Sequence, residues 1–262
     1  MWLTYLLLIF TGIVSGFVNT LAGSGSLINL TVLMFVGLPA NIANATSRLG
    51  ILLQSITGVW VFYKNGKIDL KKSIWFLIPM VLGAIFGAQT ASFLSEEATK
   101  SSMAVMMFLM LFLILLKPEK WLKEKSEIIN EKTVLNFIIF LVIGFYGGFL
   151  MSGVGILILA ALVLRSGYNL TEANALKILA VFLFTVPVVC IFIFHKQIIW
   201  EYGFFMAIGQ GIGAWFAAKF AIKSKSANLW THRLLILVVL ASILQILEID
   251  QWILKLFYKI FV

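Results

Sequence analysis

Residues 16–26 read GFVNTLAGSGS, and residues 144–155 read GFYGGFLMSGVG. Each glycine-rich stretch interrupts a long apolar run, the first beginning near Trp2 and the second near Thr133. Glycine lets a chain leave helical geometry and lets another group approach its backbone closely. We therefore predict two broken helices, each restarting after its break, at Ser26 and at Ile156.

The composition of the whole chain is that of a membrane protein. Its 262 residues are 61% hydrophobic and 12% charged, whereas a typical soluble domain is about 45–50% apolar and about 25% charged. This difference excludes a soluble enzyme, a nucleic-acid-binding module, a disulfide scaffold and a disordered chain. The net charge of +9 fits the enrichment of Lys and Arg in cytoplasmic loops. We expect a lipid bilayer around the chain and no nucleic-acid partner.

The apolar runs predict an all-α polytopic membrane protein. A spanning helix needs about 20 mainly apolar residues, and open sheet edges do not survive in lipid. Two further runs, residues 27–36 and 156–164, are too short to span and follow the two breaks. The main predicted segments are residues 2–22, 41–63, 70–94, 99–116, 133–150, 171–194, 198–222 and 231–247.

The chain also matches itself when it is shifted by 130 residues, the distance from Gly23 to Gly153. At this offset Gly37 falls on Gly167, Ala43-Asn44-Ala45 on Ala173-Asn174-Ala175, and Gly83-Ala84 on Gly213-Ala214. We interpret the match as two tandem homologous repeats of about four hydrophobic segments, each opening with a Gly-broken helix. The predicted organisation is a first repeat at 1–116, a charged linker at 117–132, a second repeat at 133–247 and an interfacial tail at 248–262. A regulatory or partner site is the alternative interpretation of the linker.

Two membrane topologies are compatible with this duplication. If each copy crosses four times, the copies are parallel. If each broken segment is a re-entrant hairpin, each copy crosses three times and the copies are inverted. The inverted arrangement places most of the 20 Lys and Arg residues on one side, as the positive-inside tendency favours.

Paired breaks of this kind suggest a transport site. Duplicated membrane proteins with interrupted helices in matching positions are usually secondary transporters whose site lies where the breaks meet. A helix that restarts inside the membrane exposes N–H groups with partial positive charge, which bind anions. We therefore predict a small anionic substrate. The candidate substrate-binding residues are Asn19, Thr20, Gly23, Ser24, Gly25, Ser26, Asn44, Arg48, Gln54, Ser152, Gly153, Gly155, Asn174 and Lys177.

Other interpretations of these residues stay open. The glycines of the breaks could serve only close helix packing, which is our preferred interpretation for Gly83, Gly87, Gly209 and Gly213. The asparagines at positions 44 and 174 could cap helices while Arg48 and Lys177 reach to the interface. Alternatively, the two cations supply fixed positive charge along an anion path. Gln54 and Gln210 must each find a partner or line a wet cavity.

The chemistry that the sequence lacks narrows the function further. There is no nucleophile–base pair, no phosphate-binding loop and no Cys/His cluster with metal-ligand spacing. We expect no catalytic residue, no metal and no cofactor. An intramembrane enzyme and a non-transporting membrane partner or assembly factor remain as alternatives.

In these motifs the sequence resembles the TauE/SafE family of sulfite exporter-like membrane proteins, also called the toluene-sulfonate uptake permease group. The likeness is carried by residues 16–26, residues 43–46, residues 83–88, residues 144–155, and then Asn174 with Lys177. The resemblance implies transport of small sulfur-containing or organic anions, such as sulfite and sulfonates, across a cytoplasmic membrane. We accordingly expect a multi-pass transporter or facilitator that works by alternating access of its two repeats.

Overall fold

The computed structural model describes residues 2–68, 70–103, 105 and 133–223. Within these residues every regular element is helical, which confirms the predicted fold class. The linker, the segment at 231–247, the tail and most of the segment at 99–116 lie outside the described residues. The elements are α1 (Trp2–Ala22), α2 (Gly25–Phe35), α3 (Ala40–Lys64), α4 (Leu70–Ser92), α6 (Val134–Phe149), α7 (Val154–Ala160), a π-helical turn (Ala161–Arg165), α8 (Leu170–Phe194) and α9 (Trp200–Lys223).

Both predicted breaks interrupt their helices, although the helices restart earlier than we expected. α2 begins at Gly25 rather than at Ser26, and α7 begins at Val154 rather than at Ile156. The reason is that a single left-handed glycine before each restart, Gly23 (φ 82°) and Gly153 (φ 70°), reverses the chain at once. Glycine adopts such positive φ values without the steric cost of a Cβ atom.

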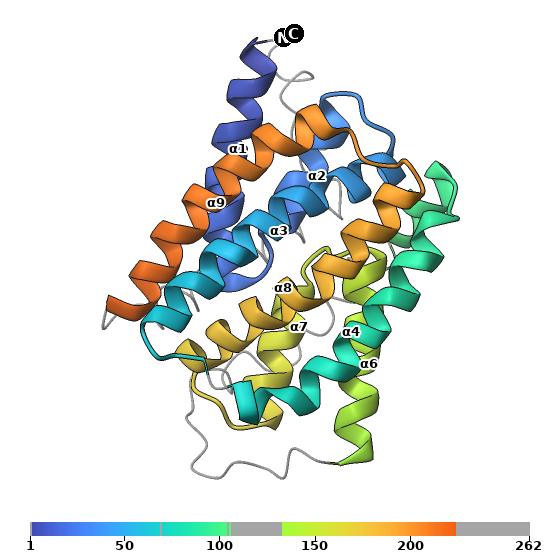
Figure 1. Ribbon diagram of the computed structural model, residues 1–262. Coiled ribbons are helices and arrows are strands. Elements are labelled where there is room, and N and C mark those ends of the chain that lie inside the picture. Colours follow the sequence, from blue (N-terminus) through green and yellow to red (C-terminus); the bar gives the residue numbers. More distant parts are fainter. Residues whose placement is uncertain (1, 69, 104, 106–132, 224–262) are drawn as a thin grey trace, which may run out of the picture.

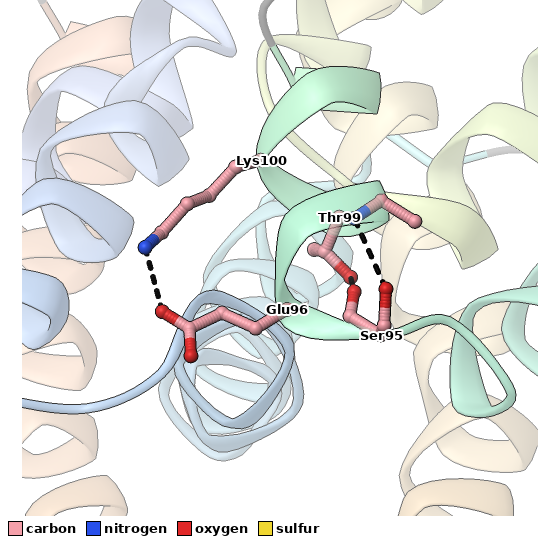
Figure 2. A network of polar contacts seen from close by, with 5 residues as sticks. Ser95, Glu96, Thr99 and Lys100 are labelled. Carbon is pink, nitrogen blue, oxygen red and sulfur yellow. Dashed lines mark hydrogen bonds and ion pairs between the residues drawn. The ribbon is translucent and has the colours of Figure 1, made fainter.

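A short helical stretch after α4, residues 96–103, starts with side-chain capping by Ser95. The Ser95 hydroxyl accepts from the backbone N–H of Ala98 (3.2 Å), and the Thr99 hydroxyl donates to the Ser95 carbonyl oxygen (2.8 Å). Lys100 and Glu96 form an ion pair of 2.6 Å one turn apart on its exposed side (Figure 2). Such a cap fixes where a helix begins.

The two broken helices enter the bundle from opposite ends. In Figure 1, α1 descends from the top and α6 rises from the bottom, while α3 and α8 cross the middle in opposite directions. α1 packs along α9, and α6 packs along α4. α3 and α8 contact each other, and they contact α9 and α4 respectively. Each broken helix therefore packs mainly on a long helix from the other half of the chain, the last long one among the described residues.

Glycines form the contact surfaces of these two pairs. A Cβ atom on Gly213 of α9 would come within 2.1 Å of the carbonyl oxygen of Ile13, and one on Gly83 of α4 within 2.1 Å of that of Leu141. Gly209 and Gly87 make the same kind of backbone contact one turn away. Small residues at such spacing let membrane helices approach closely. The packing interpretation of these four glycines is confirmed, and we call the two surfaces the α1–α9 and α4–α6 seams.

The offset of 130 residues recurs in the geometry. α3 spans residues 40–64 and α8 spans 170–194, so both ends differ by 130. Positive φ angles recur at the same offset, at Gly23 and Gly153, Gly37 and Gly167, and Gly66 and Lys196. These bounds support the predicted duplication, which itself stays a prediction.

The outside of the bundle is apolar, and its mainly hydrophobic interior also holds buried polar and charged side chains. Phe86 is 66% exposed and Phe216 is 55% exposed, whereas Arg48 is fully buried. Four of the described helices are long and apolar enough to cross a membrane: α1, residues 73–92 of α4, α8 and α9. α3 is equally long, but it carries Asn41, Asn44, Arg48 and Gln54. The polar helix thus lies where the bundle shields it, as a bilayer requires.

Candidate functional site

The two breaks meet inside the protein. Gly23 and Gly155 touch backbone to backbone, so a Cβ atom on Gly23 would come within 2.4 Å of the Gly155 carbonyl carbon. The hydroxyl of Ser26 donates to the Met151 carbonyl oxygen (3.1 Å) and accepts from the Gly153 N–H (3.1 Å). The structure therefore brings the two predicted halves of the site together, with Ser26 joining them.

Lys177 of α8 closes the carboxyl end of α1. Its ammonium group donates to the carbonyl oxygens of Asn19 (3.0 Å) and Thr20 (2.7 Å) and to Asn174 Oδ1 (2.8 Å). The last carbonyl groups of a helix lack intrahelical partners and carry partial negative charge. A cation from the second half of the chain thus binds the broken helix of the first half.

Arg48 of α3 performs the same task for α6. Its guanidinium donates to the carbonyl oxygens of Gly147 (2.6 Å) and Gly148 (2.9 Å). Asn44 supports it, because Asn44 Oδ1 accepts from Arg48 Nη2 (3.1 Å) while Asn44 Nδ2 donates to the Phe149 carbonyl oxygen (2.8 Å). The two cations therefore form a reciprocal pair of contacts between the halves.

These contacts overturn the capping interpretation of the two asparagines. The residue that caps α3 is Pro39, and α8 is capped by Asn169, whose side chain accepts from the Glu172 N–H (2.9 Å). Asn44 and Asn174 instead lie one turn inside their helices and bind the cations. Nor do Arg48 and Lys177 reach to the interface, since their exposed fractions are 0% and 1%.

Several polar atoms at the breaks have no hydrogen-bond partner although they are buried. They include the hydroxyls of Thr20, Ser24 and Ser152. Gln54 uses only its oxygen, which accepts from Asn19 Nδ2 (3.3 Å), so its amide nitrogen is unpartnered. Arg48 also keeps its Nε without a partner. Buried polar groups in proteins are nearly always satisfied by protein, water or ligand, so these groups have hydrogen-bonding capacity left for water or a polar solute.

The remaining candidate residue, Gly25, serves packing. A Cβ atom on Gly25 would come within 2.0 Å of the Ser15 carbonyl oxygen, so this glycine lets α2 fold back tightly on α1. This short return path brings Ser24 and Ser26 beside α1.

The charge of the site is positive and uncompensated within the described part of the chain. No described residue places a carboxylate within 4 Å of Arg48 or Lys177. The ion pair between Lys100 and Glu96 lies elsewhere, at exposed positions. The described residues also contain no group of three His, Cys, Asp or Glu side chains that could hold a metal ion. The groups that Arg48 and Lys177 contact are uncharged backbone carbonyl and asparagine oxygens, so no described negative charge balances the two cations.

Sequence reasoning left three polar residues of this region out of the site. Gln210 of α9 is fully buried, and both atoms of its amide are unpartnered. Asn29 of α2 is in the same state. Tyr146 donates its hydroxyl to the Ser152 carbonyl oxygen and so braces the second break. A polar side chain in the middle of an apolar run was the available signal for Gln210 and Asn29.

The chain shows clear sequence similarity to membrane transporters. The family described as "Sulfite exporter TauE/SafE" matches residues 8–246. The chain belongs to the TauE/SafE family. The breaks, the seams and both buried cations all lie within the matched residues, so the TauE/SafE match covers the whole site.

Relatives of this TauE/SafE protein carry transporter names. "Probable membrane transporter protein ORF9" of Sinorhizobium is 25% identical over 241 residues, which cover 89% of this chain and 88% of the relative. "Probable membrane transporter protein YfcA" of Escherichia coli is 26% identical, covering 79% and 77%. A protein of Bacillus subtilis, "Probable membrane transporter protein YdhB", is 30% identical and covers 59% and 61%. No solved structure matches the chain. With its apolar spanning helices, the chain is a multi-pass protein of a membrane transporter family.

Proposed function

We propose that this protein is a secondary transporter or facilitator of a small anion of the sulfite or sulfonate class, located in the cytoplasmic membrane. The observation that carries the proposal is the burial of Arg48 and Lys177 without a described carboxylate partner. Charged groups inside membrane proteins are costly and mark substrate paths. A bound anion would offset this cost.

The anion would lie beside the meeting point of the breaks. The unpartnered hydroxyls of Thr20, Ser24 and Ser152 and the free Nε of Arg48 are the donors available to it. The family name, which refers to sulfite export, supports this substrate class. A carboxylate-rich cation path has no support among the described residues that surround the two buried cations.

The mechanism we propose is alternating access between two inverted repeats, 1–116 and 133–247. The opposite entry of α1 and α6 in Figure 1 and the matched bounds of α3 and α8 support an inverted duplication. Each broken helix is hydrogen-bonded to a cation from the other half of the chain, α1 to Lys177 and α6 to Arg48. Movement of one half against the other would open the site to one side of the membrane at a time.

The proposal is tested by reconstituting the purified full chain in liposomes and measuring uptake of labelled sulfite and of a labelled sulfonate. The Arg48→Ala variant is expected to lose at least tenfold in uptake, because it removes a buried positive charge from the anion's path. Lys64→Ala is the matched control, since Lys64 lies exposed near the Trp60 ring at the end of the same helix.

A thermal-stability screen with sulfite, sulfonates, carboxylates and simple cations complements the uptake measurement. Selective stabilisation by one class of anion is expected, since a ligand that binds only the folded state raises its stability. Stabilisation by cations alone would contradict the proposal. Unchanged uptake by a folded Arg48→Ala protein would remove Arg48 from the transport path.

A further inference from the structure

A second group of polar side chains lies next to the cations and forms a distinct part of the interior. Gln210 of α9 is fully buried at the place where α9 crosses both α1 and α3. A Cβ atom on Gly50 of α3 would come within 2.2 Å of Gln210 Nε2, so this glycine makes room for the amide. On α1, Gly16 lies against the Gln210 backbone. Both amide atoms of Gln210 are unpartnered.

Two further amides lie one helical turn away on the same faces. Gln54 follows Gly50 by four residues, and Asn19 follows Gly16 by three, so each pair shares one face of its helix. Asn19 and Gln54 bond to each other, and the Asn19 carbonyl oxygen binds Lys177. We call Asn19, Gln54 and Gln210 the amide cluster. It extends the cation site of Lys177 toward α9.

The crossing of α6, α8 and α4, around the second break, has no amide at the matching positions. Shifted by 130 residues, Gln54 corresponds to Phe184, Gln210 to Met80, and Asn19 to Phe149. All three counterparts are buried hydrophobic residues. The same helix crossing therefore packs well without polar groups, and the amide cluster is not required by the architecture.

The chemistry of an amide restricts what can satisfy it. Its NH₂ group donates hydrogen bonds, whereas its oxygen needs a donor. An anion that carries only acceptors can bind the nitrogen of Gln210 but leaves the oxygen unpartnered, at a cost of about 1–3 kcal/mol for a buried group. An anion that also carries an O–H or N–H group satisfies both atoms.

From this arrangement we propose that the amide cluster is a subsite for a hydrogen-bond donor on the transported anion, which selects hydroxyl- or amino-bearing organic anions over acceptor-only anions. The inference rests on the proposed anion transport. The charged end of the solute lies near Lys177 and Arg48, and its hydroxyl or amino group reaches Gln210. Gln54 lies one helical turn, about 5.4 Å, from Gly50, which Gln210 contacts, and this spacing suits an anion with a two-carbon chain.

Matched pairs of ligands test the inference. The purified full chain is titrated with 2-hydroxyethanesulfonate and ethanesulfonate, and with glycolate and acetate, and half-maximal thermal stabilisation is measured for each. We expect the hydroxyl-bearing member of each pair to bind about tenfold more tightly. A tenfold ratio corresponds to about 1.4 kcal/mol, within the range for a buried polar group left unpartnered.

The Gln210→Met variant introduces the residue found at the matching position of the other half. It is expected to reduce the ratio within each pair to about one and to raise the melting temperature of the ligand-free protein. Gln89→Met, at an exposed position of α4, is the control and should keep the wild-type ratio.

Each outcome has a defined meaning. Equal binding of both members by the wild-type protein, as expected if water satisfies Gln210, overturns the inference and leaves the proposed anion transport intact. An unchanged ratio in Gln210→Met also overturns it. If no anion stabilises the protein, the proposed function itself fails, and this inference fails with it. The ratio of affinities measured for the wild-type protein tests the inference even if the Gln210→Met variant does not fold.

Discussion

The helix crossings around the two breaks differ in what they bury. The crossing of α1, α3 and α9 holds Asn19, Gln54 and Gln210, whereas the crossing of α6, α8 and α4 holds Phe149, Phe184 and Met80. The glycine seams and the left-handed turns recur in both halves. The difference shows that glycine packing recurs at both crossings, whereas the buried amides, and with them the proposed ligand chemistry, lie at the crossing of α1, α3 and α9.

The strongest test of the common plan concerns the seams. Gly213→Ala and Gly83→Ala each place a methyl group 2.1 Å from a backbone oxygen, which only backbone movement can relieve. We expect each to destabilise the protein by about 3 kcal/mol, the upper end of the usual overpacking cost. Melting temperature in detergent and the yield of monodisperse protein measure the loss.

A matched control lies two residues away on α9. A Cβ atom on Gly211 would meet only side chains, Leu53 at 3.3 Å and the Thr57 hydroxyl at 3.5 Å, so Gly211→Ala is expected to be nearly neutral. If Gly213→Ala and Gly83→Ala differed strongly, the two seams would not be equivalent and the comparison of the halves would break.

A smaller effect is expected from removing the charge that holds the first hairpin. Lys177→Met removes the donor to the Thr20 carbonyl oxygen and to Asn174 Oδ1, while the Asn19 carbonyl oxygen keeps its bond from the Gly23 N–H (2.9 Å). We expect a loss of about 2 kcal/mol, since unsatisfied buried groups cost about 1–3 kcal/mol. Melting curves of Lys177→Met and Arg48→Met sharpen the comparison, because equal losses would mean that both hairpins depend equally on the opposite half.

The smallest effect separates two serines of the first break. Ser26 bridges to Met151 and Gly153, whereas the Ser24 hydroxyl has no partner. Ser26→Ala is therefore expected to cost about 1 kcal/mol, and Ser24→Ala to leave the ligand-free stability unchanged while it weakens anion-dependent stabilisation. A fall in ligand-free stability for Ser24→Ala would mean that its hydroxyl has a structural partner.

The apolar runs of the sequence were sufficient to place the helices. The predicted segment at 171–194 became α8 (Leu170–Phe194), and the segment at 41–63 became α3 (Ala40–Lys64). The starts of α2 and α7 were one or two residues wrong, because the length of a turn depends on which glycine adopts a positive φ. Hydropathy does not carry that information.

The partners of the site residues were harder to predict than the residues themselves. Arg48 and Lys177 were chosen because charges inside membrane segments are rarely incidental. Their bonds to Gly147 and Thr20, however, join segments about a hundred or more residues apart in the chain. Backbone carbonyl groups are the same at every position, so no pattern of side chains identifies these acceptors. Gln210 was noticed as polar, but its position beside Gly50 depends on how α9 crosses α3.

The glycine rows of the two seams are buried between the halves of the chain. α1 covers its glycine row with α9, and α6 covers its own with α4, so neither half buries a complete row by itself. If the chain arose by gene duplication, its single-copy precursor could cover these rows only by associating with a second molecule inserted upside down. A present-day chain cut within residues 117–132 should accordingly regain its structure only when both pieces are synthesised together.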